Sequence, residues 1–453
     1  MVVREVVECV EAVPEYSRFP LVDELTSSTR ELGRRFSDRV EVFEVSCSRS
    51  GDPILATRIG RGSRVVLALG LVYPDDPASA LALDYLSWYM VKRPEVWMVS
   101  DTTWIIVKVV DALGARFNEE WFRDVSSVEK LILNHYVPPP SLCVESTFPI
   151  EYKELRWSKP LPETEAIMKL VNDYKPQFIF QFRSCFFRGL AYYLSRHSPE
   201  LYRYLRAISE RFKLPLYASE FRPPYVIKLD TAVYRVPRAR DYCDVVESVL
   251  GRVPVDVLKF GGSSGDFIEG FSGDVLEVVA EVPYVVDERI SDTAPTGIPR
   301  REVFLLSLRK LRFELRNLRK NLEILRKYVS SDNPYYEALD HMTPLDLVNT
   351  EIQDKWIKSH GTSTESATVA DIVSSYVVHY LYTTALKYGL LHQCIRYETT
   401  RGRTVPSTIK GNVVKKVEKH LHELNSCARY RKVSIRNVVQ TCLYTMLMVV
   451  TLL

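Results

Sequence analysis

Three short apolar stretches, each with polar residues near its end, constrain the fold of this chain most strongly. They read SRVVLALGLVYPDDP (residues 63–77), FIFQFRS (residues 178–184) and VLEVVAEVP (residues 275–283). Nearly continuous apolar runs are typical of strands that are buried on both faces of a parallel sheet. The carboxyl ends of such strands form the ligand-binding edge of an α/β sheet, so polar side chains there predict a site. These side chains are Tyr73, Asp76, Arg183 and Glu281, and we expect Arg183 to form an ion pair with at least one of the two acids.

The patterns along the rest of the chain predict two parts with different architecture. Strand and helix patterns alternate up to residue 299, and the expected strands include residues 40–45, 53–60, 103–110 and 224–229. Such alternation predicts an α/β fold with a mixed, largely parallel sheet flanked by helices. Only helical patterns follow. We therefore expect an α/β domain at residues 1–299 and an all-helical C-terminal domain at residues 300–453.

Eight apolar residues at heptad spacing predict one long helix at the start of the helical part. They are Phe304, Leu308, Leu311, Leu315, Leu318, Leu322, Leu325 and Val329. A leucine seam of this length must be covered by another helix. We expect the cover to come from this chain, from helical patterns at residues 364–391 and 436–453. The same helix of a second subunit is the alternative, so the oligomeric state is left open.

Two further features of the helical part bear on partners. Residues 300–327 contain ten Lys or Arg against three Glu. We interpret them as the solvated flank of the seam and expect no nucleic acid, because no recognised module or set of interleaved aromatic residues is present. Residues 438–453 are strongly apolar but shorter than the ~20 apolar residues of a membrane span. They predict a buried closing helix and no membrane partner; a membrane tail anchor is the alternative.

The composition predicts a globular, cytoplasmic protein. The 453 residues are 46% hydrophobic and 26% charged, with a net charge of +3, which excludes disorder as the default. The eight cysteines include no C-x-x-C pair, so a zinc ribbon is excluded and reduced thiols are expected. The first residues, MVVREVVECVEAVPEY, lack the apolar core of a signal peptide. Only five glutamines occur, which favours a thermophilic source.

Six segments in a consistent order resemble the zinc carboxypeptidase family, the carboxypeptidase A-like metallopeptidases. VEVFEVSCSRSGDPI is similar to the family's first strand and turn, and GLVYPDDP stands where the family has its G-x-H-x-x-E metal loop. DALGARFNEEW, STFPIEYK with KPLPETEA, and QFRS follow in the family's order. GGSSGDF and AEVPY resemble the loop and the strand that carry the catalytic glutamate. The resemblance covers residues 40–300 and implies the carboxypeptidase fold.

The resemblance also shows where this chain departs from the family. Carried over by position, the former metal-ligand residues are Tyr73, Asp76 and Arg183, the catalytic general base is Glu281, and the carboxylate-binding residues are Arg116 and Asn118. Tyrosine rarely binds zinc, and a permanently protonated guanidinium has no free lone pair for a metal. The first histidine of the chain is His135, so no H-x-x-E pair precedes it. We therefore expect neither a metal nor another cofactor, and we expect Glu281 to be silent.

The resemblance and its departures predict a catalytically inactive pseudopeptidase rather than an enzyme. Its cleft is expected to bind peptide C-termini or other small carboxylates. Two alternatives remain open. One is an active, divergent metallocarboxypeptidase or amidohydrolase that holds zinc with a non-standard set of ligands. The other is an assembly or interaction protein that acts through the helical C-terminal region.

Overall fold

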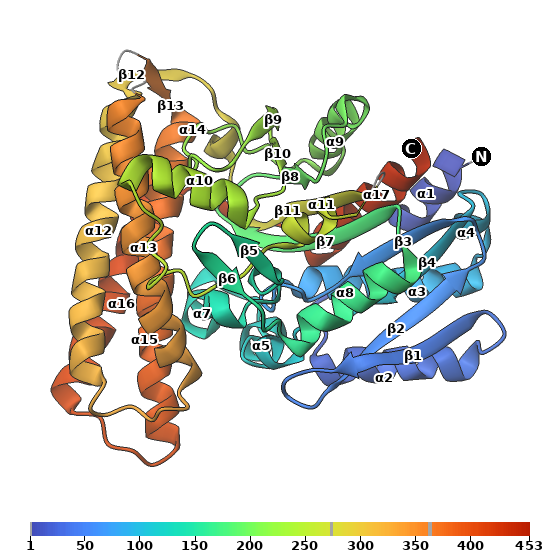
Figure 1. Cartoon of the computed structure of the whole chain (residues 1–453), viewed down its shortest axis with the longest axis horizontal. Coiled ribbons are helices and arrows are strands. Elements are labelled where there is room, and N and C mark those ends of the chain that lie inside the picture. Colours follow the sequence, from blue (N-terminus) through green and yellow to red (C-terminus); the bar gives the residue numbers. More distant parts are fainter. Residues whose placement is uncertain (1, 272–274, 361–364) are drawn as a thin grey trace.

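The computed structural model, which describes residues 2–271, 275–360 and 365–453, is organised by a ten-stranded sheet (Figure 1). In spatial order its strands are β1 (Val40–Cys47), β2 (Pro53–Gly60), β4 (Thr102–Val107), β3 (Arg64–Leu69), β7 (Phe178–Phe186), β11 (Leu276–Asp287), β8 (Ala191–Leu194), β10 (Val233–Arg235) and β9 (Lys228–Asp230), and β14 (Tyr430–Lys432) pairs with the end of β11. The central strands β4, β3, β7 and β11 are parallel, whereas β1, β2, β8 and β9 pair antiparallel with β2, β4, β11 and β10. The predicted α/β fold with a mixed sheet is confirmed.

The strands formed where the apolar patterns predicted them, with one partial exception. Residues 63–70, 103–110 and 275–282 all contribute to the same sheet, through β3, β4 and β11. The strand predicted at residues 224–229 is mostly loop, and β9 begins only at Lys228. Pro223 and Pro224 open this segment, and a proline cannot donate to a strand ladder, which explains the late start. Two short two-stranded pairs lie outside this sheet in the described residues: the hairpin of β5 (Ile150–Tyr152) with β6 (Leu155–Trp157), and β12 (Pro295–Pro299) with the distant β13 (Ser366–Thr368).

Helices cover both faces of the sheet, because alternate strand residues are apolar on both sides. Val66 and Ala68 of β3 pack into a large core with one set of helices, and Leu67 and Leu69 pack into a second core on the opposite face. The first set is α1 (Val2–Glu11), α2 (Val22–Arg35), α3 (Pro77–Lys92), α9 (Pro199–Phe212) and α17 (Ile435–Leu452). The second face carries α8 (Pro162–Tyr174) and α11 (Ser264–Glu269). The remaining short helices are α4 (Glu95–Met98), α5 (Ala112–Arg116), α6 (Glu119–Arg123), α7 (Val128–Asn134) and α10 (Ala239–Leu250).

The helical part lies at one end of the molecule, on the left of Figure 1. It consists of α12 (Arg300–Leu325), α13 (Pro334–Ser359), α14 (Val369–Ile372), the π-helix η4 (Val373–Tyr382), α15 (Thr383–Thr400) and α16 (Ser407–Cys427). The seam of α12 is buried within the chain: Leu308 and Leu325 are 0% exposed and Leu315 is 2% exposed. The cover predicted at residues 364–391 is confirmed in η4 and α15, although residue 364 lies outside the described residues.

The cover predicted from residues 436–453 is wrong, because the chain returns to the sheet after α16. Helix α17 packs against α1, α3, α9 and β11, and α13 takes its place on the seam. In the described part of the chain, α17 is the one helix long and apolar enough to cross a membrane, and 67% of it is buried here. Thr441 and Thr445 satisfy their hydroxyls within the helix by donating to the carbonyls of Asn437 and Thr441. The division of the chain at residue 299 stays a prediction.

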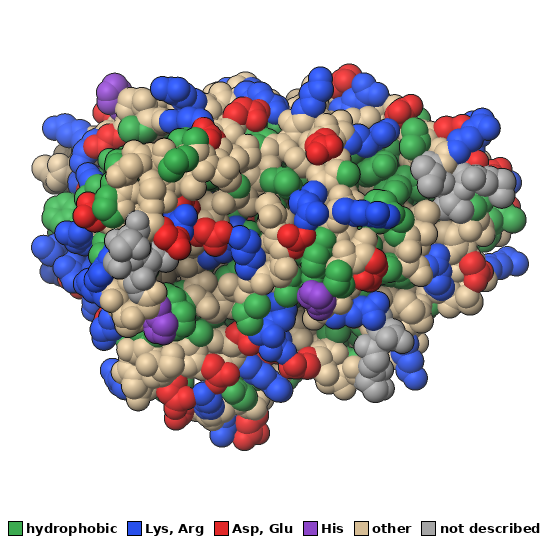
Figure 2. Space-filling view, turned by 90° about the horizontal axis from the view of Figure 1, so that it is seen from above, with side chains coloured by type: hydrophobic (Ala, Val, Ile, Leu, Met, Phe, Trp, Pro, Cys, Tyr) green, Lys and Arg blue, Asp and Glu red, His purple; other side chains and the backbone are tan. Residues whose placement is uncertain are grey.

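The outer face of α12 carries exposed basic side chains. Arg309, Arg316, Arg319 and Lys320 lie along the helix, and Arg326 and Lys327 follow directly after its end. Seen from above, Lys and Arg side chains gather at the left-hand end of the molecule, over this helical part (Figure 2). The basic residues are therefore solvated while the leucine side of the same helix is buried.

Candidate ligand-binding cleft

A cavity of about 340 Å³ lies on the sheet face that also carries α8 and α11. Its floor is formed by side chains that alternate along the two central strands: Arg183 on β7, and Val279 and Glu281 on β11. Arg183 and Glu281 are direct neighbours across the two parallel strands. Tyr73, Glu145 and Arg188 line it as well. The strand ends predicted to converge therefore do converge, and three of the four predicted residues line one cavity.

Arg183 is a charged side chain that lies open to this cleft. Its side chain is exposed to the cavity, and its guanidinium lies 5.2 Å from the centre of the Tyr73 ring. Within the described residues, Arg183 forms no ion pair within 4.0 Å. An arginine stays charged at any physiological pH and offers a planar fork of donors that fits a carboxylate.

Glu281 is paired with Arg188, and the ion pair that we predicted for Arg183 is not formed. Nη1 of Arg188 lies 3.3 Å from both carboxylate oxygens of Glu281. Arg188 reaches the cleft from the tight connection between β7 and β8, where Phe187 has a positive φ of 60°. Its guanidinium also lies 5.2 Å from the Tyr217 ring. The sequence did not predict Arg188 as a residue of the cleft, because it lies in a turn outside the segments that resemble the carboxypeptidase family.

Asp76 lies beneath the cleft and does not line it. The residue is 1% exposed and precedes α3, and its Oδ1 accepts a hydrogen bond of 2.6 Å from Ser184. Its Oδ2 is buried and has no hydrogen-bond partner. Burial raises the pKa of Asp76 to about 6, and the neighbouring Asp75 acts in the same direction.

The residues at the family's metal position do not fit zinc. Zinc in proteins takes three or four Cys, His or carboxylate ligands, and the described residues contain no group of three such side chains that could hold a metal ion. Asp76 is turned away to Ser184, and Arg183 brings a permanent positive charge to the place of the second histidine.

His135 is a buried residue rather than the solvated loop histidine that its sequence context suggests. It is 5% exposed, and its Nε2 lies 3.1 Å from Oδ2 of Asp75. Burial alone would raise the pKa of Asp75, but the hydrogen bond and charge of His135 hold it below its ordinary value. The rings of Trp121 and Phe186 enclose the imidazole. This pair anchors the loop after β3 to the loop after α7.

Arg116 and Asn118, the predicted carboxylate ligands, do not line the cavity. Arg116 forms ion pairs with Asp23 at 2.7 Å and with Asp52 at 2.6 Å. The amide nitrogen of Asn118 donates to three backbone carbonyls, those of Pro74, Gly114 and Tyr136. Both side chains are thus already bonded within the fold, and their predicted ligand role stays a prediction.

A buried cluster of carboxyl and amide groups forms the inner wall of the cleft, and sequence reasoning missed it. Gln181 donates from Nε2 to Glu277 at 2.8 Å and to Glu145 at 3.3 Å. Ser264 donates to Glu145 from both its backbone nitrogen, at 2.9 Å, and its hydroxyl. The spacing along the strands could have indicated this cluster. Glu277 lies four residues before Glu281, and Gln181 lies two residues before Arg183. Even spacings put both members of each pair on the same face of their strand.

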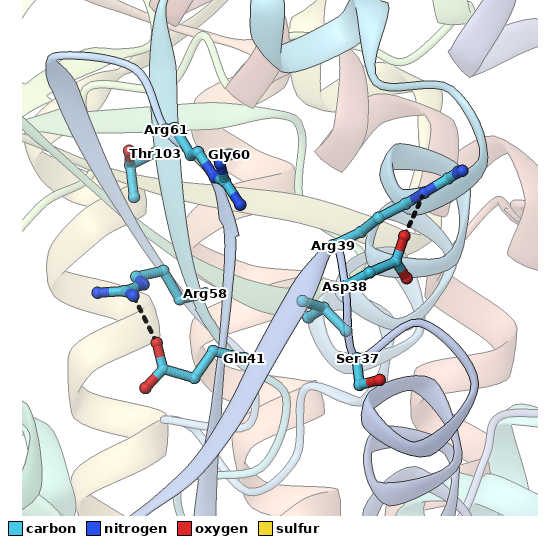
Figure 3. A pocket seen from close by; sticks show the side chains of 9 residues that line it. Ser37, Asp38, Arg39, Glu41, Arg58, Gly60, Arg61 and Thr103 are labelled. Carbon is cyan, nitrogen blue, oxygen red and sulfur yellow. Dashed lines mark hydrogen bonds and ion pairs between the residues drawn. The ribbon is translucent and has the colours of Figure 1, made fainter.

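A larger pocket lies elsewhere, toward the opposite edge of the sheet (Figure 3). It measures about 610 Å³ and is lined by residues at the start of β1, the end of β2 and the start of β4. Two of its arginines are paired with acids: Arg58 with Glu41 at 2.7 Å and Arg39 with Asp38 at 3.4 Å. Arg61 also lines this pocket. Exposed pairs of this kind are solvated and weak, so the smaller cleft is the better candidate.

Comparison with known proteins gives structural matches only. No protein-family model and no curated protein matches the chain. Carboxypeptidase A from Helicoverpa armigera is similar at 13% identity and a TM-score of 0.39, over 62% of this chain and 72% of that chain. Thrombin activatable fibrinolysis inhibitor is similar at 12% and 0.35, over the same shares, and a metallo-carboxypeptidase from Burkholderia cenocepacia at 9% and 0.34, over 75% and 70%. The first and third of these are carboxypeptidases by name, and the likeness in each case is one of fold alone.

Proposed function

We propose that this protein binds a ligand carboxylate, such as a peptide C-terminus, in the cleft and does not cleave it. The observation that carries the proposal is Arg183, a charged group that lines the cavity, is exposed to it and forms no ion pair within 4.0 Å with any residue that the structure describes. A guanidinium in such a place favours an anion, and a carboxylate fits its paired donors. Arg188 adds a second guanidinium nearby, although Glu281 already holds it.

The same residues support the part of the proposal that concerns catalysis. Glu281, the retained general-base position, is bound to Arg188 through both of its oxygens. A general base must reach the proton that it abstracts, and this carboxylate is held at the guanidinium. The competing proposal, a divergent metallopeptidase, would need a metal held by residues other than Tyr73, Asp76 and Arg183.

Calorimetry with two short peptides tests the proposal. The probes are an N-acetylated tripeptide that ends in norleucine with a free carboxylate and the same peptide with a C-terminal amide. We expect the carboxylate form to bind at least about tenfold tighter, because a hydrogen bond to a charged group contributes about 1.5 to 3 kcal/mol. Arg183→Ala should remove this difference. Arg61→Ala, which removes an arginine from the other pocket, should leave it unchanged.

Two results would contradict the proposal. Equal affinity for the carboxylate and the amide, or no binding of either, would show that Arg183 is not a carboxylate site. Stoichiometric zinc in the purified protein, together with release of the terminal residue from the peptide, would establish the metallopeptidase alternative instead. Thermal unfolding of Arg183→Ala serves as the control for folding, and an unchanged midpoint is expected for an exposed side chain.

A further inference from the structure

Helix α12 exposes large apolar side chains on the face turned away from its leucine seam. Leu306 is 47% exposed, Phe313 is 62% exposed and Ile324 is 53% exposed. They are three of the ten large apolar side chains that are exposed in the residues the structure describes. Single exposed apolar side chains are normal on a protein surface, but several on one face of one element indicate an interaction site.

The three side chains form one line along the helix. They are seven and eleven residues apart, and at ~3.6 residues per turn these steps are about two and about three whole turns. All three therefore lie on the same side of α12, over about 27 Å at ~1.5 Å rise per residue. We call this line the apolar ridge. Helix α12 itself lies on the outer side of the helical part, at the left in Figure 1.

A row of basic side chains flanks the apolar ridge. Arg309, Arg316 and Lys320 are exposed, and at ~100° per residue all three lie about 40–80° to the same side of the ridge. None of them forms an ion pair within 4.0 Å with a residue that the structure describes, and the exposed Glu323 is already paired with Arg319 at 3.5 Å. We call these three residues the basic row. Its charges have no acidic partner in the described part of the chain.

The other side of the ridge is polar and also lacks an acid. Asn317 and Asn321 lie there and are partly buried, and the Lys310 ammonium lies 5.5 Å from the centre of the Tyr380 ring. The exposed apolar surface of α12 is therefore one side chain wide, with positive charge beside it. A helix that binds a bilayer needs a broad apolar face, whereas a partner helix can pack on a single ridge and place its charged residues alongside.

We propose that the apolar ridge and the basic row form a docking surface for an acidic amphipathic helix of a partner protein. Apolar side chains of the partner pack between those of the ridge, and its Asp or Glu residues pair with the basic row. A second copy of α12 fits less well, because it brings the same positive row. The ridge supplies most of the affinity, since exposed ion pairs contribute little, and the charges select the partner. The surface shares no residue with the cleft, so this inference goes beyond the proposed function and does not depend on it.

Fluorescence anisotropy with two designed helical peptides tests the docking surface. Both peptides have leucine at the first and alanine at the fourth position of three heptads. One has glutamate at the fifth and seventh positions, and the other has glutamine there. At low salt we expect the glutamate peptide to bind at least about tenfold more tightly, and the difference should shrink as added salt screens the basic row. Sedimentation with anionic phospholipid vesicles, where we expect no binding, tests the membrane alternative.

Two pairs of variants locate the binding on this face. Phe313→Ala should weaken binding of the glutamate peptide at least about fivefold, whereas Met98→Ala, which removes a side chain that is 60% exposed on α4, should leave it unchanged. Arg316→Glu should reduce the preference for the glutamate peptide at least about threefold. Arg326→Glu makes the same change in charge beyond the end of α12 and should leave the preference nearly unchanged. All four residues are exposed, so an unchanged thermal midpoint serves as the control for folding.

Three results would overturn the docking surface. The first is equal binding of the two peptides, or binding of neither. The second is binding of the glutamate peptide that is unaffected by both Phe313→Ala and Arg316→Glu. The third is sedimentation with the vesicles that Phe313→Ala abolishes, which would identify the face as a membrane-binding surface instead. None of these results bears on the carboxylate test of the cleft, so the two proposals fail separately.

Discussion

Arg183 puts a fixed positive charge where three strand ends meet, and the proposed ligand is chosen by that charge. Its neighbours adjust to that charge: the Tyr73 ring lies beside it, and Glu281 across the strand is held by Arg188 instead. Asp76 is buried, forms no ion pair with a residue that the structure describes, and accepts a hydrogen bond from the Ser184 hydroxyl. An ionised carboxylate in that position lowers the stability of the folded state at neutral pH, because its charge has neither an ion-pair partner nor solvent around it.

The variant Asp76→Asn should therefore stabilise the protein at neutral pH. Burial raises the pKa of Asp76 from 3.8 to about 6, so the folded state binds its proton more tightly than the unfolded state does. The associated stability is present below pH 4 and is lost as the pH rises through 6, on the order of 2 to 3 kcal/mol in all. We expect Asp76→Asn to unfold at higher denaturant concentration than wild type at pH 8 and at an equal concentration at pH 4.

The adjacent residue provides a control of opposite sign. His135 holds the pKa of Asp75 below its ordinary value despite burial, so its ionised form stabilises the fold, and this contribution is lost as the pH falls. Asp75→Asn should therefore destabilise the protein at pH 8. Loss of stability in both variants at pH 8 would indicate that Asp76 has a bound cation as partner.

Helix α12 separates two surfaces along its length. Its leucine side packs against α13, η4 and α15, and its opposite side presents arginine and lysine to solvent. A heptad seam can be covered by any helix with a matching apolar side. Here the cover is contributed by the chain itself, so a second subunit is not required to bury the seam.

Two substitutions on α12, two residues apart, test this arrangement. Leu315 is 2% exposed and Phe313 is 62% exposed. Leu315→Ala should lower the free energy of unfolding by about 2 to 4 kcal/mol, because it leaves a cavity in the seam, and Phe313→Ala should change it by less than about 0.5 kcal/mol. Light scattering should give the same molar mass for both variants and wild type. A fall in mass for Leu315→Ala with the monomer still folded would mean that the seam is a subunit interface.

The whole molecule is closed by its last helix, which joins the far end of the chain to its start. Strand β14 extends the ladder of β11, and α17 then packs against α1 and α3. The amide of Gln440 donates to the Val10 carbonyl at 2.9 Å, which links the two terminal helices directly. An apolar helix in this position is part of the core of the sheet, and the same composition would suit a membrane anchor only if the helix were free.

Charged substitutions in α17 distinguish these two roles. Met446 is 0% exposed, whereas Thr451 is partly exposed near the end of the helix. In buffer without detergent, Met446→Lys should destabilise the protein by more than about 4 kcal/mol, because it buries an unpaired charge, and Thr451→Lys should have little effect. Thermal unfolding monitored by circular dichroism measures both. Similar stability of the two variants would show that α17 does not contribute to the folded core.

The sequence by itself determined the strands, most helices and the meeting of their ends. Apolar runs and heptad spacing are local patterns, and they placed β3, β7 and β11 in one sheet with Tyr73, Arg183 and Glu281 at one cleft. The substitution of arginine for a metal ligand was equally visible, since it depends on residue type alone.

Only the tertiary structure decided which side chains bond to which. Arg188 and Glu281 are 93 residues apart, and Gln181 and Glu277 are 96 apart. Several arginines and acids compete for each such contact, and ångström-scale differences in backbone position choose between them. The same holds for the seam, where α13 and α17 were both apolar enough to cover α12. The short strand β14 decided the outcome, because its pairing with β11 brings α17 back to the sheet and leaves the seam to α13.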